Sequence, residues 1–294
     1  MLVTLPNFDY FSCKTIEEAC SLLSKYKSEA QVLAGGTDLL VKMKHKKMLP
    51  RYLINIKRIP DLSYIRYDDH EGLRLGVLTT MQTIKSSPLI TKKFLVLNQA
   101  AGTLGTSQIR YLATLGGNLC NASPAAECAP ALLTLEARAK IVGLRGERTV
   151  PIDQFFKGPG ESILEKDEIL TEIQVPNLPA RTEGIYLKHS TRRVDVAIVS
   201  VAVLITMDGQ TCQDIKIALG AVGPTPFRAR KAEGILRGQK LNGEPDKILE
   251  KVTQVASEES FPIDDIRGYA DYRKKMVETL VRQGLERVIA QIKS

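Results

Sequence analysis

Two pairs of adjacent glycines, each inside a short polar motif, place the strongest constraint on how this chain folds. The first pair lies in AGGTD at residues 34–38, and the second lies in TLGGN at residues 114–118. Paired glycines at a strand end allow positive φ angles and a close approach to a ligand. Their N–H groups, with a helix N-terminus behind them, suit a pyrophosphate. We therefore expect each loop to follow an apolar strand and both loops to clamp one diphosphate.

Neither glycine motif matches a standard nucleotide fingerprint. GxGxxG of dinucleotide-binding folds and GxxxxGK[ST] of P-loop enzymes are both missing, which disfavours a Rossmann site and an NTPase. A single Gly-Gly turn is more often structural than functional, but two in one chain favour a shared ligand. The residues alone indicate a diphosphate-containing cofactor.

Hydrophobic periodicity predicts a mixed α+β fold that changes character near residue 177. A capping box at Thr15–Glu18 starts the first helix, and Pro176, Asn177 and Pro179 mark the boundary. Before it we expect strands at 31–34, 52–56, 62–67, 73–78, 139–144, 148–152 and 168–175, and helices at 39–43, 81–85, 89–101 and 125–135. After it we expect a hairpin of strands 196–207 and 211–219 around Asp208-Gly209, then helices at 227–236, 246–258 and 269–291.

Composition narrows the function classes. The 294 residues have a net charge of +8, but no basic stripe with interleaved aromatics points to nucleic acid. The Lys-rich segment 42–47 is interpreted as a solvated helix end, and an acidic protein partner or an anionic cofactor fits the basic balance better. No signal peptide and no membrane span is visible, so we expect a cytoplasmic protein.

The five cysteines form no CxxC pair, which disfavours a disulfide framework, a zinc site and a self-contained iron–sulfur site. Cys120 and Cys128, which lie near the second motif, are interpreted as ordinary free thiols. The histidines His45, His70 and His189 are isolated in sequence, and we interpret them as surface or structural residues. No catalytic acid or base stands out, and no metal site is expected in this chain.

Four segments together resemble the FAD-binding medium subunits of the molybdenum hydroxylase family, which includes xanthine dehydrogenase and carbon monoxide dehydrogenase. These segments are LAGGTDLLVKMK at 33–44, SQIR at 107–110 with ATLGGNL at 113–119, NASPAAECAPA at 121–131, and GAVGPTPFRAR at 220–230. They span nearly the whole chain in the order that the family has.

The resemblance implies an FAD-binding domain of the vanillyl-alcohol-oxidase type at residues 1–177, made of two α/β subdomains at about 1–57 and 58–177. A C-terminal domain of the carbon monoxide dehydrogenase flavoprotein type, with a β-sheet and helices, would occupy residues 178–294. FAD would be bound noncovalently. The residues implied to bind it are Val32, Leu33, Ala34, Gly35, Gly36, Thr37, Asp38, Leu104, Thr114, Leu115, Gly116, Gly117, Asn118, Glu127, Leu170 and Lys188.

Four of these positions are more distant from the glycine pairs. Glu127 stands where aspartate is more usual in the family, which keeps the charge but lengthens the side chain by one methylene. Leu104 and Leu170 match flavin-lining positions, although alone they would equally be core residues. Lys188 begins KHSTRRVDVA, which resembles the family's Lys…Arg…Asp-x-Ala segment. A lysine there can stabilise negative charge on a reduced flavin ring, whereas without the resemblance it would be a surface cation.

The function implied by the resemblance is electron transfer within a multi-subunit enzyme. FAD on this chain would take electrons from 2Fe-2S clusters on an iron–sulfur subunit and pass them to an external acceptor such as NAD+. Molybdopterin would lie on a third subunit, and the organic substrate would bind there. The chain lacks the cysteine-rich insertion of some relatives, so we expect no cluster of its own. The alternatives are a self-sufficient FAD-dependent oxidase of the same superfamily and a cofactor-free scaffold protein.

Overall fold

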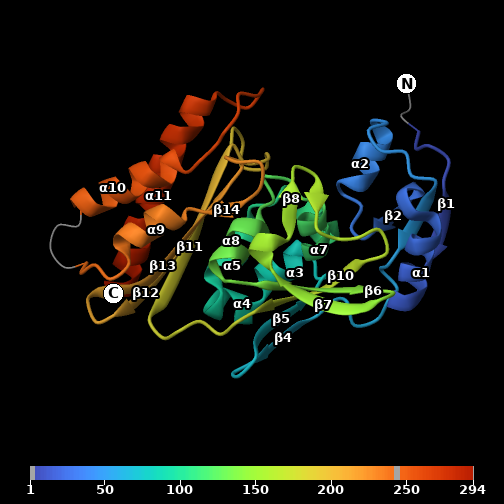
Figure 1. The fold of residues 1–294 in the computed structure, drawn as a ribbon, viewed down its shortest axis with the longest axis horizontal. Helices are drawn as coiled ribbons and strands as arrows, with labels where there is room; N and C mark the ends of the chain where they lie inside the picture. The colour runs from blue at the N-terminus through green and yellow to red at the C-terminus, as the bar shows by residue number, and fades with distance from the viewer. Residues whose placement is uncertain (1–3, 242–245, 294) are drawn as a thin grey trace.

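The computed structural model describes residues 4–241 and 246–293. Three larger β-sheets follow one another along the long axis in Figure 1, and two short strands form a separate two-stranded sheet. The N-terminal elements, in blue, lie at one end, and the C-terminal helices, in orange and red, lie at the other. The mixed α+β class expected from the sequence is confirmed.

The N-terminal sheet is parallel and small. Its strands are β1 (Asp9–Ser12), β2 (Ala30–Leu33) and β3 (Tyr52–Asn55), in the order β1-β3-β2. Helix α1 (Ile16–Tyr26) begins as expected, with the Thr15 hydroxyl accepting the N–H of Glu18 at 3.1 Å, and the short turn η1 (Lys27–Glu29) follows it. Helix α2 (Leu39–Lys44) follows β2. The sequence predicted β2, β3 and both helices but missed β1.

The central sheet is antiparallel, in the order β4-β5-β10-β6-β7. Its strands are β4 (Ile65–Asp68), β5 (Gly72–Gly76), β6 (Arg138–Gly143), β7 (Gly146–Pro151) and β10 (Ile169–Val175). The short strands β8 (Phe156–Gly158) and β9 (Glu161–Ser162) pair with each other in the separate two-stranded sheet. The helices of this central region are α3 (Met81–Ser86), α4 (Pro88–Lys93), α5 (Leu95–Gly102), α6 (Ser107–Leu112), α7 (Leu115–Cys120) and α8 (Cys128–Thr134), with the turn η2 (Ile152–Gln154).

The continuous helix expected at 89–101 is wrong. Phe94 separates α4 from α5, because its backbone has φ −138° and ψ 50°, outside the helical region. Its side chain is buried in the central core. Packing of this one aromatic residue thus overrides the helical periodicity on either side.

The C-terminal sheet has the order β11-β12-β13-β14 and is antiparallel. It contains β11 (Thr182–His189), β12 (Val199–Asp208), β13 (Thr211–Gly220) and β14 (Phe227–Arg228), followed by α9 (Arg230–Leu236), α10 (Asp246–Glu258) and α11 (Ala270–Lys293). The hairpin around Asp208-Gly209 is confirmed, and Gly209 has φ +56°. The helix expected at 227–236 is shorter, since Phe227 and Arg228 pair with β13 instead.

This last sheet is covered on both faces. Val201, Val203 and Ile205 of β12 share a core with α9, α10 and α11. The intervening Ala202 and Leu204 belong to the core of the central region. Helices α5 and α8 of that region pack directly on the C-terminal sheet (Figure 1), so the two parts of the chain share a dry, packed boundary.

Candidate functional site

The first glycine pair forms the loop that the sequence predicted. It connects β2 to α2, and Gly36 has φ +74°, a conformation that favours glycine. A Cβ on Gly35 would lie 2.2 Å from the carbonyl oxygen of Leu112, so only glycine fits there. The backbone N–H groups of Gly35 and Thr37 have no acceptor among residues 4–241 and 246–293. These amides are free to bind an anion.

The rest of the first motif lies around this loop. Val32 is half-buried on β2, and Leu33 packs with Met43 and Leu53 in a small core of its own. Ala34 is half-buried next to the loop. Asp38 precedes α2; desolvation raises the pKa of its carboxyl, and Lys42 opposes this rise.

The second glycine pair is not a loop. Gly116 and Gly117 lie in the first turn of α7, neither has a positive φ, and helix α6 rather than an apolar strand precedes them. Thr114 caps α7, since its hydroxyl accepts the N–H of Gly117 at 3.1 Å. The amides of Leu115 and Gly116 donate to the carbonyls of Thr79 and Val77 at 3.0 and 2.8 Å. The predicted cradle of free amides at 114–118 is therefore wrong.

Packing explains the first glycine of the second pair. A Cβ on Gly116 would lie 2.7 Å from the Cβ of Val77, so α7 approaches the end of β5 closely only with glycine there. The two glycine segments nevertheless lie side by side. Gly35 contacts the backbone of Leu112 and Ala113, directly before Thr114. Lys42 of α2 donates to the Asn121 side chain, just after α7, at 2.6 Å.

A buried ion pair lies close to α7. Lys188, near the end of β11, has its Nζ 3.3 Å from Oε1 of Glu127 and 3.0 Å from the carbonyl oxygen of Thr103. The two charged side chains are only 3% and 11% exposed. Asn118 donates to Oε2 of Glu127 at 3.3 Å and accepts the Cys128 N–H at 3.2 Å. The structure thus brings together three of the expected residues, Asn118, Glu127 and Lys188.

The two leucines are core residues in this structure. Leu104 is buried after α5, and its carbonyl accepts a hydrogen bond from Arg110 at 3.0 Å. Leu170 is buried in β10, beside a bulge in its pairing with β6. Both pack in the central core.

Two hydroxyls near the ion pair were missed from the sequence. Tyr186 and Ser200 are buried, and neither hydroxyl has a hydrogen-bond partner within the part of the chain that the structure describes. Tyr186 lies two residues before Lys188 on β11, and Ser200 lies opposite Lys188 on β12. Burial raises the pKa of Tyr186, and the nearby Glu127 adds to the rise. No sequence pattern identified these hydroxyls, because β11 was not predicted and its burial does not alternate.

The cysteines are protonated thiols at neutral pH. All five are free, and burial raises the pKa of Cys120 to about 12 and that of Cys20 to about 11. Within the described ranges, no three His, Cys, Asp or Glu side chains are grouped so that they could hold a metal ion. Nor does any helix of residues 4–241 and 246–293 have the length and apolarity needed to cross a membrane.

Two family descriptions match consecutive parts of the chain. Residues 6–178 match the FAD binding domain in molybdopterin dehydrogenase, and residues 185–288 match the CO dehydrogenase flavoprotein C-terminal domain. Among curated relatives, the chain is 32% identical to the glyceraldehyde dehydrogenase medium chain of Sulfolobus acidocaldarius, covering 96% of this chain and 99% of the relative. It is 33% identical to the carbon monoxide dehydrogenase medium chain of Hydrogenophaga pseudoflava, covering 95% and 96%.

Solved structures agree with these matches. The fold superimposes on carbon monoxide dehydrogenase from Hydrogenophaga pseudoflava lacking the Mo-pyranopterin moiety, with a TM-score of 0.91, 33% identity and coverage of 98% of this chain and 99% of that chain. It also superimposes on quinoline 2-oxidoreductase from Pseudomonas putida 86, with a TM-score of 0.92, 25% identity and coverage of 99% and 100%.

Proposed function

Because this chain belongs to the family of FAD-binding medium subunits of molybdopterin dehydrogenases, we propose that it transfers electrons from partner 2Fe-2S clusters, through FAD, to an external acceptor such as NAD+. The chain is an oxidoreductase subunit. FAD supplies the redox chemistry, and the protein binds, orients and electrostatically tunes it.

The observation that carries this proposal is the free-amide loop, together with a buried ion pair that contacts the neighbouring helix α7. The unpaired N–H groups of Gly35 and Thr37 suit the FAD pyrophosphate, and Gly36 allows the backbone to turn towards it. Thr114 and α7 lie next to this loop, so we propose that Thr114 to Asn118 form the adjoining wall of the site. The residues present therefore fit the cofactor.

Glu127 and Lys188 would serve the flavin part of the cofactor differently. Glu127 offers a carboxylate that can accept hydrogen bonds from hydroxyl groups. Lys188, held by Glu127 and Thr103, offers a fixed positive charge in surroundings that exclude water. Such a charge stabilises negative charge on a reduced ring more strongly than an exposed lysine would.

The partners in this proposal are an iron–sulfur subunit and a molybdopterin subunit. Relatives of nearly the same length are named as medium chains of their enzymes, and we propose that the organic substrate binds on another subunit of the complex. These matches do not favour a self-sufficient oxidase. We also propose a domain boundary at 177/178, subdomains at about 1–57 and 58–177, and a cytoplasmic location, which the five free thiols favour.

Purification of the chain together with its partner subunits tests the proposal. Acid precipitation should release one FAD per chain and leave no flavin fluorescence in the pellet, because the glycine loop holds the cofactor without a covalent bond. FMN in the supernatant, or flavin fluorescence that stays with the pellet, would contradict this. So would hydroxylation of purines, aldehydes, nicotinate or carbon monoxide by the isolated chain.

A further inference from the structure

Helix α8 carries a carboxylate at each end, and both carboxylates pair with cations of the C-terminal sheet. Glu127 directly precedes α8 and pairs with Lys188 of β11. Glu136 follows α8 in a left-handed conformation, with φ +50°. Its carboxylate pairs with Lys216 of β13 and Arg228 of β14.

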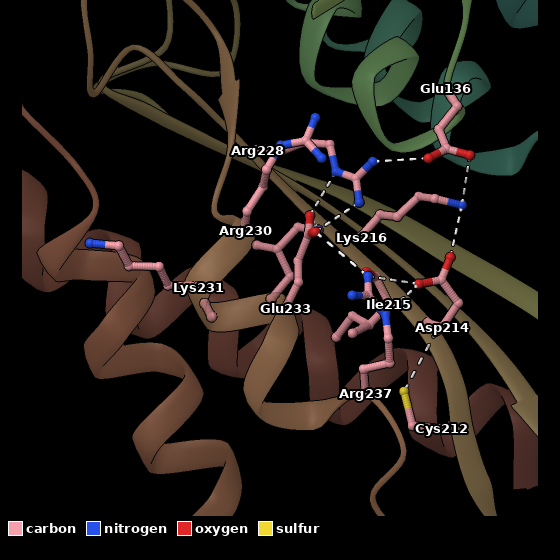
Figure 2. Close-up of polar contacts among 12 residues, drawn as sticks. Glu136, Cys212, Asp214, Ile215, Lys216, Arg228, Arg230, Lys231, Glu233 and Arg237 are labelled. Atoms are coloured by element: carbon pink, nitrogen blue, oxygen red, sulfur yellow. Dashed lines mark hydrogen bonds and ion pairs between the residues drawn. The ribbon is translucent and has the colours of Figure 1, made fainter.

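The Glu136 end is built around two buried cations (Figure 2). Oε1 of Glu136 lies 3.0 Å from Nη1 of Arg228, and Oε2 lies 3.2 Å from Nζ of Lys216. The cationic side chains are only 7% and 12% exposed, whereas Glu136 is 53% exposed. The acid therefore reaches inward from the surface to cations that are already buried.

These cations are fixed to the C-terminal sheet independently of Glu136. Arg228 makes two hydrogen bonds to the buried Glu233 of α9, at 2.8 and 2.7 Å, and Glu233 also accepts the N–H of Ile217 at 2.9 Å. Lys216 pairs with Asp214 at 3.1 Å. Figure 2 shows this network as one continuous chain of contacts from α9 to Glu136. The cations thus form a fixed anchor, and Glu136 is the part that attaches to it.

The body of α8 can pass a displacement from one end to the other. Every residue from Cys128 to Leu135 is buried, and α8 packs beside α5 and on strands β12 and β13. A close-packed helix of this length moves as a unit, since there are no voids for its side chains to relax into. A shift at Glu136 would therefore move Glu127 relative to Lys188.

We propose that Glu136 is a positioning residue for FAD: it fixes α8 on the C-terminal sheet and so sets the geometry of the Glu127–Lys188 pair at the other end. The inference rests on the proposed function, because it takes that pair as part of the FAD site. It adds Glu136, which lies just beyond the end of α8 opposite Glu127 and need not contact the cofactor.

The test compares two single variants in the assembled enzyme. Glu136→Gln removes the charge that attaches α8 and should raise the FAD dissociation constant about three- to fivefold, the effect of roughly one ion pair. Asp153→Asn is the matched control, because Asp153 of η2 pairs across the same boundary with Arg230 of α9 at 2.9 Å, and its carboxylate has no ion pair with α8 among the described residues. It should change FAD affinity less than about twofold. Glu136→Asp keeps the charge and should recover part of the affinity.

A double variant shows whether Glu136 acts through Lys188. In a Lys188→Met background, Glu136→Gln should have no further effect on FAD affinity, because the pair it positions is gone. A second readout needs no cofactor: exchange protection of the Cys128 amide, which donates to Asn118, should fall in Glu136→Gln and not in Asp153→Asn.

An equal effect of Glu136→Gln with and without Lys188 would overturn the inference. Wild-type affinity and unchanged Cys128 protection in Glu136→Gln would do the same while leaving the proposed function intact. A wild-type complex that binds no FAD would instead refute the proposed function, and with it the premise of this inference.

Discussion

Gly35 and the Glu127–Lys188 pair show how single residues set the properties of this site. Gly35 lets the first loop rest against the backbone at Leu112 and Ala113, and so joins the N-terminal and central sheets. Glu127 and Lys188 are charges that burial makes dependent on each other. Replacing either one affects the remaining partner as much as it affects the cofactor.

Gly35→Ala should weaken FAD binding by about tenfold or more. The new methyl group would meet the Leu112 carbonyl at 2.2 Å, and overpacking against backbone costs about 1–3 kcal/mol. Titration of the flavin-stripped complex with FAD measures the loss. Gly234→Ala in α9, where a Cβ meets nothing within 4 Å, is the control and should keep wild-type affinity. Equal affinities for the two variants would show that the first loop does not contact the cofactor.

Lys188→Met should destabilise the chain by about 3–5 kcal/mol, because it leaves the buried Glu127 carboxylate without its counter-charge. Adding Glu127→Gln should recover much of that loss, since the amide removes the uncompensated charge. Urea unfolding of the cofactor-free proteins provides the comparison. If the double variant is as unstable as Lys188→Met or more so, the contribution of these two residues to the free energy of unfolding does not come from their pairing.

At the scale of elements, the sequence predicted those whose signals are local. The capping box of α1, the β2–loop–α2 unit and the Asp208-Gly209 hairpin all follow from nearest-neighbour preferences. Helix α7 does not, because two glycines in a first turn disfavour a helix, and Gly116 is explained only by its close packing on Val77. The break at Phe94 likewise depends on core packing.

The site was predictable to a similar degree. Family resemblance and glycine chemistry identified the first loop, and the structure brings Asn118, Glu127 and Lys188 together as neighbours. The unpaired hydroxyls of Tyr186 and Ser200 required knowledge of strand register, which a single sequence does not contain. A sequence does not distinguish free backbone amides from hydrogen-bonded ones, which is why the second glycine pair was wrongly predicted to form a loop with free amides.

Asp265, which lies shortly before α11, should make the free energy of unfolding depend on pH. Hydrogen bonds from Arg267, and further ones from Arg273, hold the pKa of Asp265 well below its ordinary value, although desolvation opposes them. Because the pKa of Asp265 is lower in the folded state, its ionised carboxylate stabilises the fold above the unfolded-state pKa, which is roughly 4. This stabilisation is lost as the pH falls from there towards the folded-state pKa.

Asp265→Asn should therefore destabilise the chain at pH 7 and somewhat less at pH 3, because only part of the stabilisation is lost about one pH unit below the unfolded-state pKa. Unfolding in urea at both pH values measures the two differences, with the exposed Asp208→Asn of the β12–β13 hairpin as the control. A difference from wild type that is the same at both pH values would show that the Asp265 charge does not stabilise this segment.

At the scale of the whole molecule, the proposed cofactor site takes groups from all three of the larger sheet regions. The first loop comes from the N-terminal sheet, α7 and Glu127 come from the central region, and Lys188 comes from the C-terminal sheet. Because each part supplies different groups, the site depends on the packing between them. The central claim is that electrons leave the assembled enzyme through FAD on this chain.

The most direct test measures acceptor reduction in the assembled enzyme before and after the flavin is removed. Under anaerobic conditions, the stripped complex should still reduce its iron–sulfur clusters with the organic substrate, yet it should pass no electrons to the acceptor until FAD is added back. Unchanged acceptor reduction without flavin would contradict the account, because electrons would then leave the enzyme by a route that does not include this chain.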